Sequence, residues 1–546
     1  MTDLLIRGAT LIDGTGGPAR RENVAIDGGR IVRLAPDGAD RDAVRVVDAG
    51  GLTLAPGFID MHSHADFTLP SYPAAINSLA QGVTTEVVGN CGYSPAPLAV
   101  DARLADDQRA AARGLGPDLD WEWRTFGDFL DRLAAAAPAV NCIPLVGHGM
   151  LRMAVVGAED RAATPSELDR MRSATAEALA DGAWGLSTGL VYPPGSYAHT
   201  DEIVTVGTAL QPVDGLYASH IRDEGDGLGD ALLEAIEIGR RLGVRVEVSH
   251  LKAAGRANHG RSREALALLD GARAAGIRVH QDAYPYTAGS TLLTQLLPPW
   301  VHDGGTDALV ERLASTETRA RIAADVRDGL PGWPNYIVAS AGWEGIRIAA
   351  VADPALAALG GMSIARAAAE RHMDPLTLVL DTIAADRGAT TMMIVSLMAG
   401  DDVDAIILDP STSIGSDQLG VTARDARVHP RAYGTFVRVL RRYVRERSVL
   451  DLPTAIHRMT GLPAATLGLL DRGRIEPGAV ADLVLFDAAT VGDTATYQNP
   501  GATPTGIEAV LLGGVFAVEG GQAVRPSLGR VLRPDVSGRR RPRRSG

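Results

Sequence analysis

The stretch PGFIDMHSH, residues 56–64, ends a short apolar run with two histidines placed two positions apart. In a β-strand, residues i and i+2 point to the same face, so we expect His62 and His64 to aim at one point. Two imidazoles that share a target are typical of a metal site. The spacing therefore predicts a pair of metal ligands at the end of a strand.

Other predicted strands also end in side chains that could do chemistry. Between about residues 55 and 450, strands alternate with helices such as those near 165–181, 228–242 and 262–275. Eight predicted strands end near residues 64, 91, 148, 190, 220, 250, 284 and 417. A closed (β/α)8 barrel carries its chemistry at the carboxyl ends of its strands. The pattern predicts an α/β fold, a TIM-like (β/α)8 barrel.

The side chains at these strand ends form a coherent ligand set. A lone histidine or cysteine is more often structural, but several at one barrel edge favour a metal site. Nitrogen, sulfur and oxygen donors together suit zinc. The candidate ligands are His62, His64, Cys91, His220, His250 and Asp417.

Two further strand-end residues, His148 and Arg222, leave two interpretations open. Either could orient a ligand or the substrate. A purely structural hydrogen-bonding role fits the same positions equally well.

The two ends of the chain differ from its middle. Alternating apolar residues around Asp27-Gly28-Gly29 and around Gly513-Gly514 indicate hairpins, and neither terminal segment is large enough to be stable alone. We therefore expect residues 1–54 and 465–533 to form one small β domain around a barrel of residues 55–464. A lid or insertion is expected within about 286–390, and a disordered basic tail at 534–546.

Composition narrows the range of partners. The net charge of −13 disfavours nucleic acid as a general partner. The N-terminal residues lack a secretory pattern, and no run approaches the roughly 18 apolar residues of a membrane span. With only two cysteines, a disulfide framework is not expected. The expectation is a cytoplasmic protein that acts on a small molecule without nucleic-acid or membrane partners. Its oligomeric state does not follow from the sequence.

Specific motifs carry a family resemblance along about residues 2–530. They are GATLIDGTG, PGFIDMHSHAD, GNCGYSPAP, GLSTGLVYPPG, SHIRDEGD, SHLKAAG, DAYPYTAGST, SIGSD and HPRAYGTF. In these motifs the chain resembles the amidohydrolase superfamily and, within it, the N-acyl-D-amino-acid deacylases or D-aminoacylases. The resemblance implies zinc-dependent hydrolysis of the amide bond of N-acyl-D-amino acids. The preference for the D configuration rests on the resemblance alone.

The resemblance also divides the ligands between two metal positions. It implies one tightly held zinc on Cys91, His220 and His250, and a second, weaker metal position bordered by His62, His64 and Asp417. Many related enzymes bridge two metals with a carboxylated lysine. The only lysine here, Lys252, lies two residues beyond His250, so the bridge falls to Cys91.

Further residues have roles in catalysis and substrate binding. Asp417 is the expected proton shuttle, taking a proton from water and delivering it to the departing amine. The resemblance places Lys252, Arg431, Tyr192 and Tyr284 around the substrate carboxylate, with Ser290 bordering the site. A chain with 52 arginines and one lysine independently favours a specific role for that ammonium group. The loop from Asp417 to Arg431, which contains Arg424 and Arg427, is a few residues longer than in similar deacylases.

Two alternatives remain at this stage. A cyclic amidase such as a dihydroorotase or hydantoinase, or an isopeptidase, would share the metal but not the LVYPPG and HPRAYGTF elements. A non-catalytic barrel acting as a scaffold would be expected to lose ligands, whereas this chain retains all six.

Overall fold

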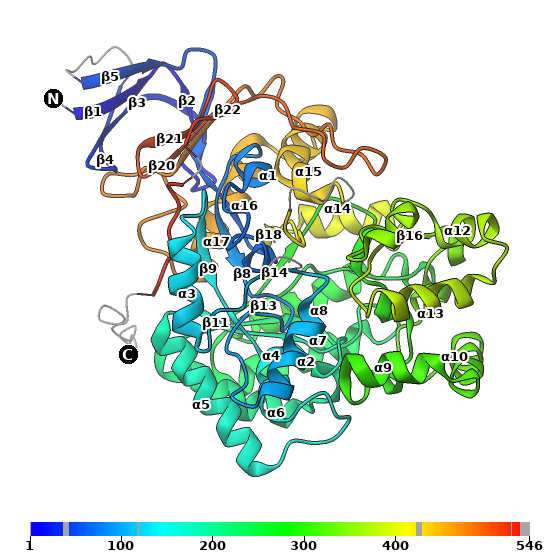
Figure 1. Ribbon diagram of the computed structural model, residues 1–546. Helices are drawn as coiled ribbons and strands as arrows, with labels where there is room; N and C mark the ends of the chain where they lie inside the picture. Colours follow the sequence, from blue (N-terminus) through cyan, green and yellow to red (C-terminus); the bar gives the residue numbers. More distant parts are fainter. Residues whose placement is uncertain (1, 37–42, 117–118, 422–427, 526, 535–546) are drawn as a thin grey trace.

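A computed structural model describes residues 2–36, 43–116, 119–421, 428–525 and 527–534. Its centre is a barrel of parallel strands (Figure 1). The strands are β7 (Phe58–Asp60), β8 (Val83–Val88), β9 (Asn141–Pro144), which continues as β10 (Val146–Gly147), β11 (Gly185–Gly189), β12 (Leu216–His220), β13 (Arg245–Val248), β14 (Val279–Ala283) and β18 (Thr412–Ile414). The backbone amide of Met61 donates to the carbonyl of Ile414 at 3.3 Å, which joins the last strand to the first. The predicted barrel is confirmed.

Helices surround the barrel because the apolar outer face of each strand must be covered. They are α1 (Ile76–Leu79), α2 (Ala102–Ala112), α3 (Phe126–Ala135), α4 (His148–Val155), α5 (Pro165–Asp181), α6 (Thr200–Gly207), α7 (Leu228–Leu242), α8 (Ser262–Ala274), α14 (Gly400–Leu408), α15 (Arg431–Arg438), α16 (Leu452–Met459) and α17 (Gly461–Leu467). A π-helical stretch, Val439–Glu446, extends α15. The helix α5 begins with a capping box, in which Glu167 accepts from the backbone amide of Thr164 at 2.7 Å.

Strands from both ends of the chain share one mixed sheet, at the upper left of Figure 1. They are β1 (Thr2–Arg7), β2 (Thr10–Leu11), β3 (Arg20–Asp27), β4 (Arg30–Pro36), β5 (Ala43–Asp48), β6 (Thr53–Pro56), β19 (Leu483–Phe486), β20 (Ile507–Leu512), β21 (Val515–Glu519) and β22 (Gln522–Ala523). The antiparallel pairing of β6 with β19 joins the two ends. Both predicted hairpins are present, as β3–β4 and β20–β21.

The chain leaves this sheet before it ends. The backbone amide of Cys142 donates to the carbonyl of Arg530 at 2.9 Å, and that of Leu532 donates to the carbonyl of Cys142 at 2.8 Å. This segment therefore runs beside the barrel strand β9. Of the tail predicted at residues 534–546, residues 535–546 lie outside the described residues.

An insertion between β14 and β18 forms a separate unit at the right of Figure 1. It contains a small antiparallel sheet in the order β15 (Gly289–Leu292), β17 (Thr391–Ile394), β16 (Ile346–Ile348). Its helices are α9 (Gly305–Ala314), α10 (Thr316–Asp328), α11 (Tyr336–Ala339), α12 (Ile364–Glu370) and α13 (Pro375–Ala385). These elements share an apolar core of their own, so the insertion is a folded unit and not a long loop.

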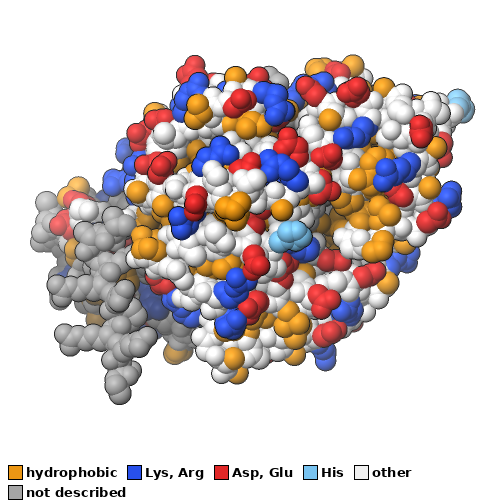
Figure 2. All heavy atoms as spheres, turned by 90° about the horizontal axis from the view of Figure 1, so that it is seen from below, with side chains coloured by type: hydrophobic (Ala, Val, Ile, Leu, Met, Phe, Trp, Pro, Cys, Tyr) orange, Lys and Arg blue, Asp and Glu red, His pale blue; other side chains and the backbone are white. Residues whose placement is uncertain are grey.

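The outer surface is mixed in charge. Figure 2 shows acidic and basic side chains interspersed over the face seen from below. None of the helices in the described ranges has the length and apolar character needed to cross a membrane.

Candidate metal centre and active site

The six predicted ligands gather at the carboxyl ends of the barrel strands. Each follows or ends one of the strands β7, β8, β12, β13 and β18, and each residue is between 0 and 7 % exposed. The barrel thus brings together side chains that are more than 350 residues apart in the chain, because parallel strands all end at the same edge. They are His62, His64, Cys91, His220, His250 and Asp417.

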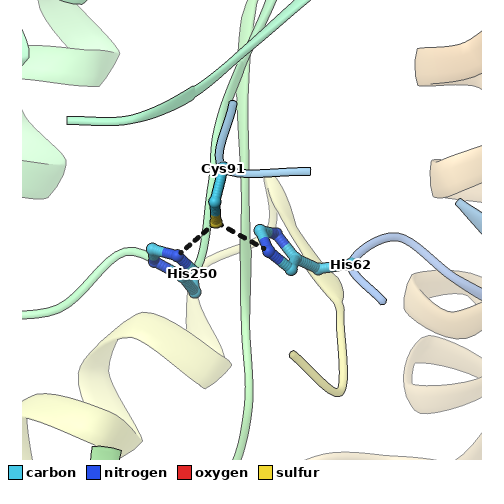
Figure 3. Close-up of side chains that lie close together, drawn as sticks. All are labelled: His62, Cys91 and His250. Carbon is cyan, nitrogen blue, oxygen red and sulfur yellow. Dashed lines mark hydrogen bonds between the residues drawn. The ribbon is translucent and has the colours of Figure 1, made fainter. Parts of the chain in front are cut away.

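Cys91 lies at the centre of the first group. Its Sγ is 3.3 Å from His62 Nε2 and 3.3 Å from His250 Nε2, and the three side chains point toward one another (Figure 3). Their ligand atoms all lie within 4.8 Å of one another. This arrangement offers one sulfur and two nitrogen donors to a single point.

Asp417 forms a second group with the H-x-H pair. Its Oδ1 is 3.6 Å from His62 Nε2 and 3.5 Å from His64 Nε2. Because His62 belongs to both groups, the two positions are adjacent. His62 and His64, which the H-x-H spacing places on one face, both approach the same carboxylate.

His220 joins the cluster through His250. Its ring centroid is 4.4 Å from that of His250, but its nitrogen groups with Glu224 and His250 and not with Cys91. Both ring nitrogens of His220 are buried without a hydrogen-bond partner among the described residues. A buried, unpartnered imidazole beside a second imidazole and the Glu224 carboxylate fits a borderline-soft cation such as zinc.

The backbone supports this assignment. Cys91, His250 and Asp417 have φ values of +54°, +35° and +51°, in the left-handed region that residues with a side chain rarely adopt. Each of them follows the end of a strand, where the chain turns over the barrel mouth. Such strained residues persist where the surrounding structure holds them, and they cluster at functional sites.

Burial sets the charge of the ligands. Burial lowers the pKa of His220 and of His250 well below the usual range, which leaves neutral rings with a free lone pair. Burial raises the pKa of the Cys91 thiol well above its usual value, and the Asp417 carboxylate raises it further. A thiolate at this position therefore requires a cation beside it.

Asp417 behaves in the opposite way. Burial alone would raise its pKa, but the Arg431 guanidinium and the nearby histidines hold the pKa of Asp417 well below its ordinary range. Asp417 is therefore a carboxylate at neutral pH, as a proton acceptor must be.

Two acids that the sequence analysis missed accept hydrogen bonds from the backbone of candidate ligands. Asp282, in β14, accepts from the backbone amide of His250 at 3.0 Å, and its other oxygen lies 3.6 Å from His62 Nδ1. Asp60, in β7, accepts from the backbone amide of His62 at 3.1 Å. Carboxylates beside metal-binding histidines commonly fix the orientation of the ring. Their position in barrel strands next to ligand segments was the available signal.

A pocket with about 650 Å³ of empty space opens over the ligands. Tyr192, Lys252, Tyr284 and Ser290 line it, as the resemblance implied. The insertion contributes apolar and aromatic side chains to the same wall, including Tyr336 and Ile394.

Some of the side chains predicted to contact the substrate already have partners within the protein. The Ser290 hydroxyl donates to the carbonyl of Met392 at 2.9 Å, so it is already engaged in the insertion sheet. Arg431 lines an adjoining pocket and reaches the site through Asp417, with its NH1 at 2.8 Å from Oδ2. Arg424 and Arg427 lie outside the described residues.

His148 and Arg222 have structural partners. His148 Nε2 lies 3.2 Å from a Glu202 oxygen, and Arg222 donates to Glu234 and to the carbonyls of Ser196 and Ala198. Neither residue lines the pocket over the ligands. Of the two interpretations left open, the hydrogen-bonding role matches the contacts of Arg222. His148 is at ion-pair distance from Glu202, and neither of its ring nitrogens has a hydrogen-bond partner among the described residues.

Glu224 is the most prominent residue that the sequence analysis did not assign. It lines the pocket, and one of its oxygens lies 2.6 Å from Lys252 Nζ. The available signal was its place in the SHIRDEGD motif, four residues after His220.

Known proteins are similar to this chain along most of its length. Residues 45–518 match the model of a family described as the amidohydrolase family. The N-acyl-D-aspartate deacylase of Alcaligenes xylosoxydans xylosoxydans is 43% identical over 536 residues, which cover 97% of this chain and 95% of that protein.

Two solved structures are also similar to this chain along 98% of its length. One is a D-aminoacylase with a binuclear metal centre, studied for one-metal activation and second-metal attenuation; it is 36% identical, with a TM-score of 0.81 over 98% of this chain and 100% of that one. Another is the N-acyl-D-glutamate deacylase of Bordetella bronchiseptica, complexed with zinc and a phosphonate mimic of the tetrahedral intermediate. It is 35% identical, with a TM-score of 0.82 and the same coverage.

Proposed function

Because this chain belongs to the amidohydrolase family, we propose that it is a metal-dependent deacylase that hydrolyses N-acyl-D-amino acids to a carboxylate and a free D-amino acid. The observation that carries the proposal is the convergence of Cys91 with buried histidines at the barrel mouth. A non-catalytic scaffold would have no need for this strained, desolvated cluster.

The ligand groups support two metal positions of unequal strength. The tight zinc would be held by Cys91, His220 and His250, and a second, weaker ion by His62, His64 and Asp417. His250 connects Cys91 with His220, and His62 connects Cys91 with His64 and Asp417, so the groups that share these histidines support two adjacent positions. The structurally similar D-aminoacylase with a binuclear metal centre supports it as well.

The chemistry follows from the groups that surround the reacting amide. A zinc ion held at this position supplies an activated water and polarises the amide carbonyl. Asp417, kept ionised by Arg431, takes the proton of the attacking water. It then delivers that proton to the amine nitrogen as the bond to the acyl carbon breaks. The two products are the acyl carboxylate and the D-amino acid.

The substrate carboxylate would lie against Lys252 and Arg431, with the hydroxyls of Tyr192 and Tyr284 beside it. Both cations lie close to the Tyr284 ring, at 5.7 Å for Lys252 Nζ and 4.8 Å for Arg431 Cζ. The Tyr284 ring thus has both cations close to it. Ser290 would border this space through its backbone, since its hydroxyl is engaged elsewhere.

The proposal places the enzyme in the cytoplasm. Both cysteines are free and buried, which suits a reducing compartment. We expect no nucleic-acid or membrane partner.

The test is a substrate panel with a metal measurement. Purified protein is assayed for release of free amino acid from N-acetyl-D- and N-acetyl-L-amino acids with neutral, acidic and aromatic side chains. Hydantoin, dihydroorotate and an isopeptide serve as controls for the alternatives. We expect turnover of D substrates with bound zinc. Turnover of the cyclic amides alone would overturn the proposal.

A further inference from the structure

One oxygen of Glu224 faces three residues of the site. Glu224 Oε1 lies 2.6 Å from Lys252 Nζ, 3.1 Å from His250 Nδ1 and 3.6 Å from His220 Nε2. Glu224 and Lys252 are each 5 % exposed, so water screens these contacts little. Glu224 therefore touches both the metal-ligand set and the proposed substrate-binding cation.

The two nitrogens of His250 have different surroundings. Nε2 faces the Cys91 sulfur at 3.3 Å, and Nδ1 faces both the Glu224 carboxylate and the Lys252 ammonium, the latter at 2.7 Å. An imidazole that ligates a metal through Nε2 carries its hydrogen on Nδ1 and donates it to a neighbouring acceptor. A carboxylate can accept that hydrogen, whereas an ammonium has only donors.

We propose that Glu224 is a positioning residue that accepts the Nδ1 hydrogen of His250 and at the same time holds the Lys252 ammonium at the pocket wall. The inference rests on the proposed function. Accepting from His250 fixes its ring as a ligand through Nε2. Holding Lys252 by charge leaves the remaining ammonium hydrogens for a substrate carboxylate. Glu224 thereby links metal retention to recognition of the substrate.

Glu224 also supplies the counter-charge of the buried Lys252 ammonium. A buried ammonium is unfavourable unless a counter-charge accompanies it. Among the described residues, Glu224 is the carboxylate that the structure places within ion-pair distance of Lys252. Lys252 Nζ already lies 2.7 Å from His250 Nδ1, so without the Glu224 carboxylate the ammonium would donate to Nδ1, which competes with ligation through Nε2.

A second buried glutamate provides a matched control. Glu202 contacts an arginine and a histidine, with one oxygen 3.0 Å from Arg152 Nε and 3.2 Å from His148 Nε2. Its residue exposure is 6 %, close to that of Glu224, but it does not line the pocket over the ligands. Substitution of Glu202 therefore reports the cost of breaking a buried ion pair without affecting the site.

The experiment compares Glu224→Gln, Glu224→Asp and Glu202→Gln with the wild type. Zinc affinity is measured by competition with a chelator, and kcat and KM are measured on N-acetyl-D-methionine and on its amide. We expect Glu224→Gln to weaken zinc binding by about 10 to 100-fold. KM should rise more for the acid than for the amide. Glu202→Gln should lower the melting temperature with unchanged zinc affinity.

Two results would overturn the inference. One is wild-type zinc affinity together with an unchanged acid-to-amide ratio in Glu224→Gln; the other is an equal loss of zinc in Glu202→Gln. If Glu224→Gln does not fold, Glu224→Asp decides, because the shorter carboxylate keeps the charge but reaches less far. Weakened zinc binding in that variant supports the role, and unchanged binding overturns it. A wild type without zinc or deacylase activity would instead defeat the proposed function.

Discussion

The Arg431 guanidinium lies 2.8 Å from the Asp417 carboxylate, and the two side chains are 1 % and 9 % exposed. The residue expected to bind the substrate carboxylate thus touches the residue expected to carry the proton. Because the guanidinium favours the ionised form of Asp417, it lowers the pKa of that group against the effect of burial. Arg431 therefore affects the chemical step as well as binding.

Arg431→Gln is expected to weaken catalysis in a pH-dependent manner. Removal of the guanidinium raises the pKa of Asp417, so Asp417 becomes protonated at a higher pH. The acid limb of the plot of kcat against pH should therefore shift to higher pH, and KM for the substrate should increase. Arg222→Gln, which removes a cation paired with Glu234, serves as the control and should leave the limb in place. An unmoved limb in Arg431→Gln would contradict this role.

Cys91→Ala should abolish tight zinc binding and activity, because the variant loses the only sulfur donor of the cluster. Metal analysis of the purified variant provides the measurement. The chain offers a control in Cys142→Ala, since Cys142 is also buried but lies in β9, where its thiol donates to the carbonyl of Val140. Zinc content at the wild-type level in Cys91→Ala would refute the assignment.

Asp417→Asn should fold and retain its tight zinc while losing most turnover. The amide keeps the size of the side chain but cannot accept a proton from water. General acid-base groups contribute roughly 10² to 10⁴-fold, so a decrease in kcat of that size is expected. Steady-state kinetics and metal analysis on the same preparation test this. A kcat close to that of the wild type would exclude Asp417 as the proton shuttle.

Lys252→Met should reduce kcat/KM for an N-acetyl-D-amino acid by about 10 to 150-fold, since a charge-assisted contact is worth roughly 1.5 to 3 kcal/mol. The loss should be smaller for the corresponding amide, which has no carboxylate to bind. Lys252→Arg should restore little, because the planar guanidinium is bulkier and the site is buried. Equal losses on acid and amide would assign Lys252 to support of His250 instead.

His280 should make the fold sensitive to mild acid. Burial, helped by the nearby Arg273, Arg245 and Arg278, lowers the pKa of His280 to about 4. The unfolded chain takes up this proton near its ordinary pKa of about 6.5, so stability is lost as pH falls from about 6.5 toward 4. In His280→Gln, the drop in melting temperature between pH 7 and pH 5 should shrink. The exposed His259→Gln should leave that drop unchanged.

The sequence predicted the ligand residues because two simple rules determine their position. Period-2 alternation places His62 and His64 on one face, and a parallel barrel brings all strand ends to one edge. These rules do not depend on loop detail. They therefore placed Cys91 and Asp417 at the barrel mouth with the histidines, despite left-handed backbones that no sequence pattern revealed.

The rest of the site depends on how loops fold back over the barrel. Glu224 reaches Lys252 from a loop after β12, and Ser290 turns its hydroxyl into the insertion sheet. Such contacts require loop conformations that local patterns do not specify. The grouping of His220 with Glu224 and not with Cys91 has the same origin. Domain boundaries likewise remain predictions, since residues 528–533 pack beside the barrel strand β9.

The pairing of β6 with β19 also imposes an order on biosynthesis. Pro56 emerges from the ribosome early, but its partner Leu483 is made roughly 400 residues later, which at about 5–20 residues per second is a delay of roughly 20–80 seconds. During that interval the amino-terminal strands have no carboxy-terminal partner, and their open edge is exposed to other nascent chains. The barrel also closes late, because its last strand, β18, is made shortly before β19. Recombinant yield should therefore depend on translation speed and on chaperones that shield a waiting edge strand.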